Sequence, residues 1–234
     1  IRHGLRTFDT SFFQAPGRTN VFDEHPFKVI LDYGHNPAAI AAMAFAEMLE
    51  GGFTRVAEFH YLHHDADGRP YANRAEMAEA VAKAASATGI GLTLLPVFYA
   101  HSGFGGAAPV EAQRRFVNDL DGFQRLMEAS GRAIAALPDA VLGVAPHSLR
   151  AVTGEELGVV CRMTTGPVHI HIAEQVAEVT EVLAAWGARP VEWALANLPV
   201  SISHTAPQDR ARRCCRTACA MLLTMPWRRV ARSG

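Results

Sequence analysis

The chain lacks an excess of charge of either sign. Its 234 residues include 22 Lys and Arg and 23 Asp and Glu, which gives a formal net charge of −1. Such a balance offers no electrostatic basis for binding nucleic acid or a membrane surface, so we predict neither partner. No apolar run is long enough to span a bilayer. The opening residues, IRHGLRTFDTSFF, lack the apolar core of a signal peptide, and we expect a cytoplasmic location.

Cysteine is also scarce, with four residues in the whole chain. Cys161 stands alone, and the others cluster near the end as Cys214, Cys215 and Cys219. This number and placement do not indicate the disulfide framework of a small secreted protein. The proportion of hydrophobic residues, 49%, and of charged residues, 19%, is ordinary for a soluble globular protein.

Three segments differ in character: residues 1–43, 44–200 and 201–234. The first contains two short extended candidates, 20–22 and 28–31, and a helix that should begin near Ala38 after the start signal Asn36-Pro37. The last contains seven arginines and no lysine. It could be a basic tail that binds nucleic acid or a stretch foreign to the fold. The abrupt change in composition favours the foreign stretch.

Strand and helix patterns alternate through the central segment. Short apolar runs typical of strands buried on both faces occur at 55–59, 91–97, 140–145 and 168–172. Helical patterns occupy 74–87, 110–137, 154–162 and 174–186. This alternation predicts an α/β fold with a parallel sheet, either doubly wound or a barrel.

The phrase PVHIHIAEQ contains the sharpest candidate for chemistry. On a strand, His169 and His171 would face the same way. A neutral imidazole is a good zinc ligand, and Glu174 follows where the strand should end, in reach of a water on such a metal. The alternative from the local pattern is a pair of histidines buried in the core.

Three further loops follow strand candidates. In APHSLR, His147 and Arg150 could hold a carboxylate, or Arg150 could cap nearby carbonyls in a solvated loop. In EFHYLHHD, the histidine spacing matches no known zinc site, while Tyr61 could contact a substrate. The Gly-rich loop FYAHSGFGG has no following Lys-Ser or Lys-Thr, which argues against a phosphate-binding P-loop.

Together these loops resemble formimidoylglutamate deiminase of the amidohydrolase superfamily. The phrases GFTRVAEFHYLHHDADGRPYAN, TGIGLTLLPVFYAHSGFGG, QRRF, APHSLRAVT, VHIHIAEQ and GARPVEW carry the resemblance over about residues 44–200. The resemblance implies a (β/α)8 TIM-type barrel, here partial, with one zinc. It implies hydrolysis of the small molecule N-formimino-L-glutamate to N-formyl-L-glutamate and ammonia in histidine degradation.

The resemblance also assigns roles to individual residues. His171 matches a zinc ligand, and Glu174 matches the acid/base that passes a proton from the metal-bound water to the departing ammonia. Tyr61, His147 and Arg150 match positions that contact substrate. His169 matches no ligand, which favours a core role for it.

The chain departs from the family in its other metal ligands. Residues 1–43 supply no His-x-His pair, Ser203-His204-Thr205-Ala206 is a poor match to the family's later catalytic histidine phrase, and we expect the last metal-binding Asp to lie beyond residue 234. We therefore expect the chain to lack hydrolase activity. The open strand edges of a partial barrel predict low stability and association of copies, for example as a homodimer.

Residues 1–43 resemble a different family. GLRTFDTSFFQAPGRTNVFDEHPFKVILDYGHNPAA is similar to the C-terminal ligase region of cyanophycin synthetase, a relative of the Mur ligases. No P-loop accompanies it, so ligase activity is not expected. Our hypothesis is a fusion or mis-assembled chain, with an ATP-dependent ligase fragment or a carboxylate-binding remnant as alternative functions.

Overall fold

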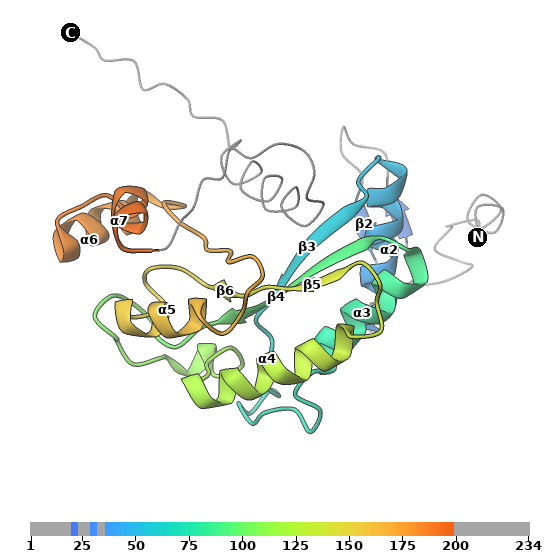
Figure 1. Cartoon of the computed structure of the whole chain (residues 1–234), viewed down its shortest axis with the longest axis horizontal. Helices are drawn as coiled ribbons and strands as arrows, with labels where there is room; N and C mark the ends of the chain where they lie inside the picture. The colour runs from blue at the N-terminus through green and yellow to red at the C-terminus, as the bar shows by residue number, and fades with distance from the viewer. Residues whose placement is uncertain (1–19, 23–28, 32–35, 199–234) are drawn as a thin grey trace, which may run out of the picture.

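A four-stranded parallel sheet lies at the centre of the molecule (Figure 1). The computed structural model describes residues 20–22, 29–31 and 36–198. The sheet has the order β3 (Arg55–His60), β4 (Gly91–Phe98) and β5 (Ala140–Leu142), and β6 (Ala145–Pro146) also pairs with β4. All of these pairings are parallel, so the predicted α/β class with a parallel sheet is confirmed.

Helices α3 (Glu76–Thr88) and α4 (Leu120–Ile134) lie along one side of this sheet (Figure 1). The side chains between helices and sheet form the main core, in which Leu94 of β4 and Ala78 of α3 are fully buried. Every residue of β4 is buried, as expected for a strand with neighbours on both edges. The sheet and its helices therefore provide a rigid base for the loops at the strand ends.

Helix α2 (Pro37–Glu50) begins where the sequence predicts. The side chain of Asn36 caps it by accepting hydrogen bonds from the backbone N–H of Ala38 and Ala39, and Pro37 takes the first helical position. The helix continues through the predicted boundary at residues 43 and 44, and Phe45 is buried in the main core. The division of the chain into three segments stays a prediction.

The short strands β1 (Asn20–Phe22) and β2 (Val29–Leu31) form a separate antiparallel pair. They match the two extended candidates predicted near the start of the chain. The predicted tail, 201–234, lies outside the described residues, together with the Ser203–Ala206 phrase. Among the described helices, none has both the length and the apolarity required to cross a membrane.

Two predicted elements are interrupted. The strand expected at 140–145 is divided into β5 and β6, and the helix expected at 110–137 is a 3-10 turn, η1 (Glu111–Gln113), followed by α4. Helix α4 begins at Leu120 because the Asp119 side chain accepts a hydrogen bond from the backbone N–H of Gly122 at 2.6 Å. The aspartate is a recognisable cap residue, but the long helical pattern around it conceals the break.

The strand predicted at 168–172 is wrong in extent, because only two isolated bridges form there. Val168 bridges to Val144, and His171 bridges to Ser148, both in parallel orientation. The facing segment is itself broken between β5 and β6, so no continuous ladder can form. Gly143 lies at this break, where a Cβ would collide with the carbonyl oxygen of Pro167.

Three helices complete the described part of the chain. They are α5 (Gly154–Cys161), α6 (Val176–Trp186) and α7 (Pro190–Asn197). The first two agree with predicted helices to within two residues, and α7 was not predicted. Figure 1 places α6 and α7 at the opposite end of the molecule from α2.

Candidate functional site

The carboxyl ends of neighbouring parallel strands carry the candidate residues. Tyr61 follows β3, Tyr99 follows β4 and His147 follows β6. Because the strands are parallel, these three positions lie at one edge of the sheet. The backbone N–H of His147 donates to the carbonyl of Phe98 at 2.9 Å, which fixes this loop beside β4.

The ring of His147 lies at the centre of an aromatic cluster. Its centroid is 4.8 Å from that of Tyr99, 5.4 Å from that of His171 and 5.9 Å from that of Tyr61, each in an edge-on arrangement. The structure thus brings together three of the predicted site residues. Tyr99 was not among the predicted residues, although it follows β4 just as Tyr61 follows β3.

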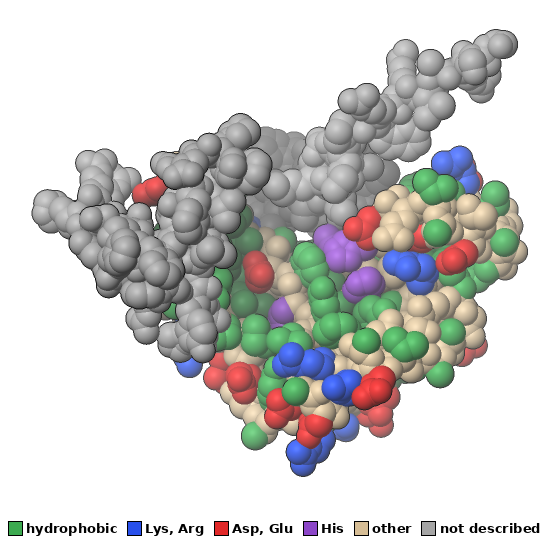
Figure 2. Space-filling view, turned by 180° about the vertical axis from the view of Figure 1, so that it is seen from behind, with side chains coloured by type: hydrophobic (Ala, Val, Ile, Leu, Met, Phe, Trp, Pro, Cys, Tyr) green, Lys and Arg blue, Asp and Glu red, His purple; other side chains and the backbone are tan. Residues whose placement is uncertain are grey.

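Phe59 lines the same face of the molecule. Its ring stacks on His169 with centroids 5.8 Å apart and meets His171 edge-on at 4.9 Å. It is 38% exposed, so this surface is only partly covered. Figure 2 shows histidine side chains next to hydrophobic ones on one face of the molecule. The site is therefore an apolar surface that contains imidazoles.

The guanidinium of Arg150 lies close to this cluster. Its Nε is buried and has no hydrogen-bond partner among the described residues. Burial, followed by the charges of His171 and Arg150, lowers the pKa of His147 to about 4. Burial raises the pKa of the Tyr99 phenol, and the charge of Arg150 opposes that rise. At neutral pH the site thus contains a cation beside a neutral imidazole, which suits an anionic ligand.

His169 takes a different position from the other imidazoles. Its ring centroid is 5.1 Å from that of His171, and its Nε2 is buried without a hydrogen-bond partner among the described residues. Burial lowers its pKa to about 4, with a further contribution from His171. Because it is neutral and packed on Phe59, His169 contributes to the wall of the site.

The side chain of Glu174 makes no contact with the aromatic cluster in the described structure. The residue is exposed, and its backbone N–H donates to the carboxylate of Glu178 at 3.1 Å. The preceding Ala173 has a φ of 57°, a left-handed conformation that is uncommon for alanine. The chain therefore turns away from the 168–172 line before Glu174, whose acid/base role stays a prediction.

The residues around His171 do not make a complete metal site. The imidazoles of His147, His169 and His171 are neighbours, and one of them has an unpartnered ring nitrogen. A zinc site needs at least three protein ligands in tetrahedral geometry. Within the part of the chain that the structure describes, no three His, Cys, Asp or Glu side chains are grouped so that they could hold a metal ion.

The histidines at the end of β3 and just after it form a buried group of their own. His60, His63 and His64 are 8%, 4% and 6% exposed. His63 Nδ1 lies 2.8 Å from the Asn118 side-chain nitrogen, and its Nε2 lies 3.1 Å from the His60 carbonyl oxygen. Both ring nitrogens of His63 are therefore occupied, which favours a structural role for it.

Comparison with known proteins identifies a relative for most of the chain. Formimidoylglutamate deiminase from Pseudomonas aeruginosa is 48% identical over 165 residues, which are 69% of this chain and 36% of the relative. A crystal structure of an amidohydrolase from Brucella melitensis is 58% identical, with a TM-score of 0.67 over 70% of this chain and 38% of that one. The chain thus spans little more than a third of each. No protein-family model matches it.

A more distant structure shares the fold alone. Atrazine chlorohydrolase TrzN from Arthrobacter aurescens, crystallised with zinc, is 18% identical, with a TM-score of 0.52 over 69% of this chain and 36% of that one. A different relationship covers 43 residues, or 18% of this chain, which are 49% identical to cyanophycin synthetase from Geminocystis herdmanii. That stretch makes up 5% of the synthetase. Most of the chain is thus similar to formimidoylglutamate deiminase and to an amidohydrolase of known structure, and a short stretch is similar to cyanophycin synthetase.

Proposed function

We propose that the central part of the chain is the substrate-recognition part of a formimidoylglutamate deiminase-type hydrolase. In this proposal the four parallel strands are part of a (β/α)8 barrel, and the loops after them bind N-formimino-L-glutamate. The identity of 48% to a deiminase and of 58% to an amidohydrolase supports this proposal. The relative's reaction would release ammonia from the formimino group and leave N-formyl-L-glutamate.

The observation that carries the proposal is the unpartnered Nε of Arg150. A buried guanidinium N–H without an acceptor is costly, and a carboxylate can accept from two guanidinium N–H groups at once. The neutral ring of His147 and the phenol of Tyr61 lie within the same cluster. They can offer hydrogen bonds to the remaining polar atoms of a glutamate derivative.

In this proposal, His171 is the one zinc ligand that this chain supplies. The donor set around His171 does not fit a complete zinc site in the described residues. Residues 1–43 contain no His-x-His pair. For the 234-residue chain by itself, we propose binding of the glutamate derivative without turnover.

Calorimetry with N-formyl-L-glutamate tests the binding site. The wild-type chain should bind this dianion, and Arg150→Ala should weaken binding by about 10- to 100-fold, the effect of losing a charge-assisted pair. Arg125→Ala, which removes an exposed arginine from α4, is the matched control and should bind as the wild type does. The absence of any heat at millimolar ligand would dispose of the proposal.

The 43-residue similarity to cyanophycin synthetase supports a second candidate, an ATP-dependent ligase fragment. This stretch amounts to 5% of the synthetase, and the sequence contains no P-loop. A titration with Mg-ATP separates the two candidates. Nucleotide binding would favour the ligase, whereas binding of N-formyl-L-glutamate alone would favour the deiminase-type site.

A further inference from the structure

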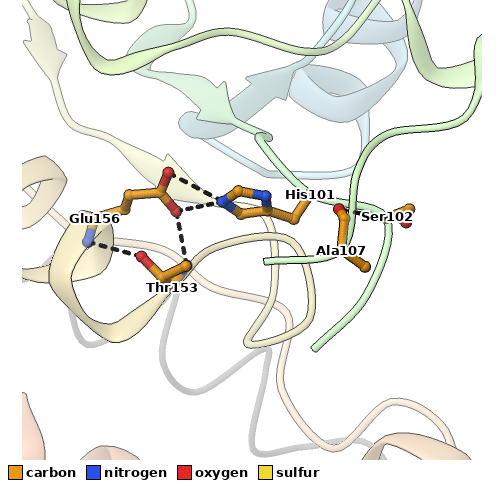
Figure 3. Close-up of polar contacts among 5 residues, drawn as sticks. All are labelled: His101, Ser102, Ala107, Thr153 and Glu156. Atoms are coloured by element: carbon orange, nitrogen blue, oxygen red, sulfur yellow. Dashed lines mark hydrogen bonds and ion pairs between the residues drawn. The ribbon is translucent and has the colours of Figure 1, made fainter. Parts of the chain in front are cut away.

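A hydrogen bond between two side chains joins the loop after β4 to the start of α5. The Nε2 of His101 lies 3.0 Å from one carboxylate oxygen of Glu156 and 2.9 Å from the other. Their side chains are 20% and 21% exposed, so the pair is largely shielded from water. Figure 3 shows the two side chains extending toward each other from the loop and the helix.

Glu156 has a second role in capping α5. Its carboxylate accepts a hydrogen bond from the backbone N–H of Thr153 at 2.8 Å, while the Thr153 hydroxyl accepts from the N–H of Glu156 at 3.2 Å (Figure 3). This reciprocal arrangement is a capping box. The carboxylate therefore fixes the helix start and His101 at the same time.

The neighbouring serine is not bonded to His101 as a nucleophile would be. The adjacent hydroxyl, on Ser102, donates to the carbonyl of Ala108 at 2.8 Å and lies 3.5 Å from that of Ala107. Figure 3 shows Ser102 beside Ala107. A serine nucleophile would instead donate to the imidazole. The pair of His101 and Glu156 thus resembles part of a catalytic triad without its third member.

The backbone next to His101 holds the loop that carries Arg150. The N–H groups of Ala100 and His101 both donate to the carbonyl of Ala151 at 3.0 Å. At the other end of the same loop, the N–H of His147 donates to Phe98. Arg150 lies between these two attachments. The contact between Glu156 and His101 lies next to the attachment at Ala151, because His101 takes part in both.

We propose that His101 and Glu156 are a positioning pair that holds the 147–153 loop, and with it Arg150, in the geometry needed to bind a carboxylate. This inference rests on the proposed function for the identity of the ligand. The attachment of the loop is a separate element of it and can be tested without a ligand. Neither residue contacts the ligand in this proposal.

Glu156→Gln in the full chain is the informative variant. Glutamine keeps an oxygen that can accept from Thr153. It replaces the carboxylate, both oxygens of which lie within hydrogen-bond distance of His101 Nε2, by a neutral amide with a single accepting oxygen. Glu155→Gln removes a charge from the same turn of α5 at an exposed residue and is the matched control. His101→Gln breaks the pair from the other side, so it decides the matter if Glu156→Gln fails to fold.

Two measurements follow. Amide hydrogen exchange in residues 147–153 should be faster in Glu156→Gln and His101→Gln than in the wild type and in Glu155→Gln. In both variants the Kd for N-formyl-L-glutamate should rise by about tenfold, which is the size of effect expected for loss of one charge-assisted contact. Because the pair acts through Arg150, Glu156→Gln should cause no further loss in an Arg150→Ala background.

Exchange in 147–153 that stays at the wild-type rate would overturn the positioning role. If Glu156→Gln lowers the affinity equally in the wild-type and Arg150→Ala backgrounds, the positioning role is overturned as well. The effect would then not act through Arg150. If the wild-type chain shows no binding, the proposed function fails, and the exchange measurement still decides whether the pair holds the loop.

Discussion

At the scale of single residues, two buried histidines at the end of β3 and just after it link stability to pH. Burial lowers the pKa of His60 to about 4. For His63, burial, the nearby His60 and His64 charges and a partly opposing hydrogen bond to the His60 backbone bring the pKa to about 3. In the unfolded chain both should titrate near about 6.5. Folding therefore excludes protons from two imidazoles.

The direction of the pH effect follows from this difference. Above about pH 6.5 both residues are neutral in the folded and the unfolded chain, so they contribute no pH dependence. As the pH falls below that value, the unfolded chain binds protons first, and each histidine lowers the free energy of unfolding by about 1.4 kcal/mol per pH unit. This loss continues until the folded pKa is reached.

Urea unfolding between about pH 8 and pH 5 measures this loss. We expect the free energy of unfolding to be level above about pH 7 and to fall steeply toward the acid end of that range. In the acid part of this range, His63→Gln should reduce the slope of the free energy of unfolding against pH by the equivalent of about one bound proton, because a neutral amide does not titrate. An identical slope in the wild type and His63→Gln would contradict the assignment, whatever the absolute stability of the variant.

At the scale of elements, the start of α4 depends on one side chain. The Asp119 carboxylate accepts from the N–H of Gly122, which would otherwise have no partner in the first turn. Asp119→Ala should lower the free energy of unfolding by about 1 kcal/mol. Asp119→Asn retains an accepting oxygen and should lose far less. Chemical denaturation at neutral pH compares the two variants, and equal losses would show that the cap does not matter.

Helix ends that depend on nearby residues were predictable from the sequence. Asn36-Pro37 predicts the start of α2 because caps act over three or four residues. The capping box of Thr153 and Glu156 at α5 is equally local, although it was not among the predicted start signals. The extent of the 168–172 strand was not predictable, because it depends on a break in the facing segment at Gly143. Such a long-range partner leaves no local pattern in the sequence.

The candidate site also combines residues whose placement was predictable from the sequence with one whose placement was not. Tyr61 and His147 come together because parallel strands end at one edge of a sheet, a rule that follows from strand direction alone. His171 joins them through an isolated parallel bridge to Ser148. Glu174 follows Ala173, whose left-handed backbone directs the chain away from the strand line. An alanine gives no indication of such a turn, since glycine and asparagine are the residues that usually adopt it.

At the scale of the whole molecule, β3 is an edge strand of the described sheet. In the described sheet β3 pairs with β4 alone. Its exposed residues include Ala57 and Phe59. An edge strand with exposed apolar side chains favours pairing with another chain, and a charged residue on it opposes such pairing. We therefore predict that the purified chain associates through β3.

Sedimentation velocity of two lysine variants tests this association. Ala57→Lys places a charge on the edge strand and should shift the chain toward the monomer, while Ala87→Lys places the same charge on an exposed position of α3 and should leave the distribution unchanged. Equal shifts in both variants would mean that net charge, rather than the β3 edge, controls association. A wild-type chain that sediments as a monomer at every concentration would mean that β3 is already protected, and the open edge would then have no consequence for assembly.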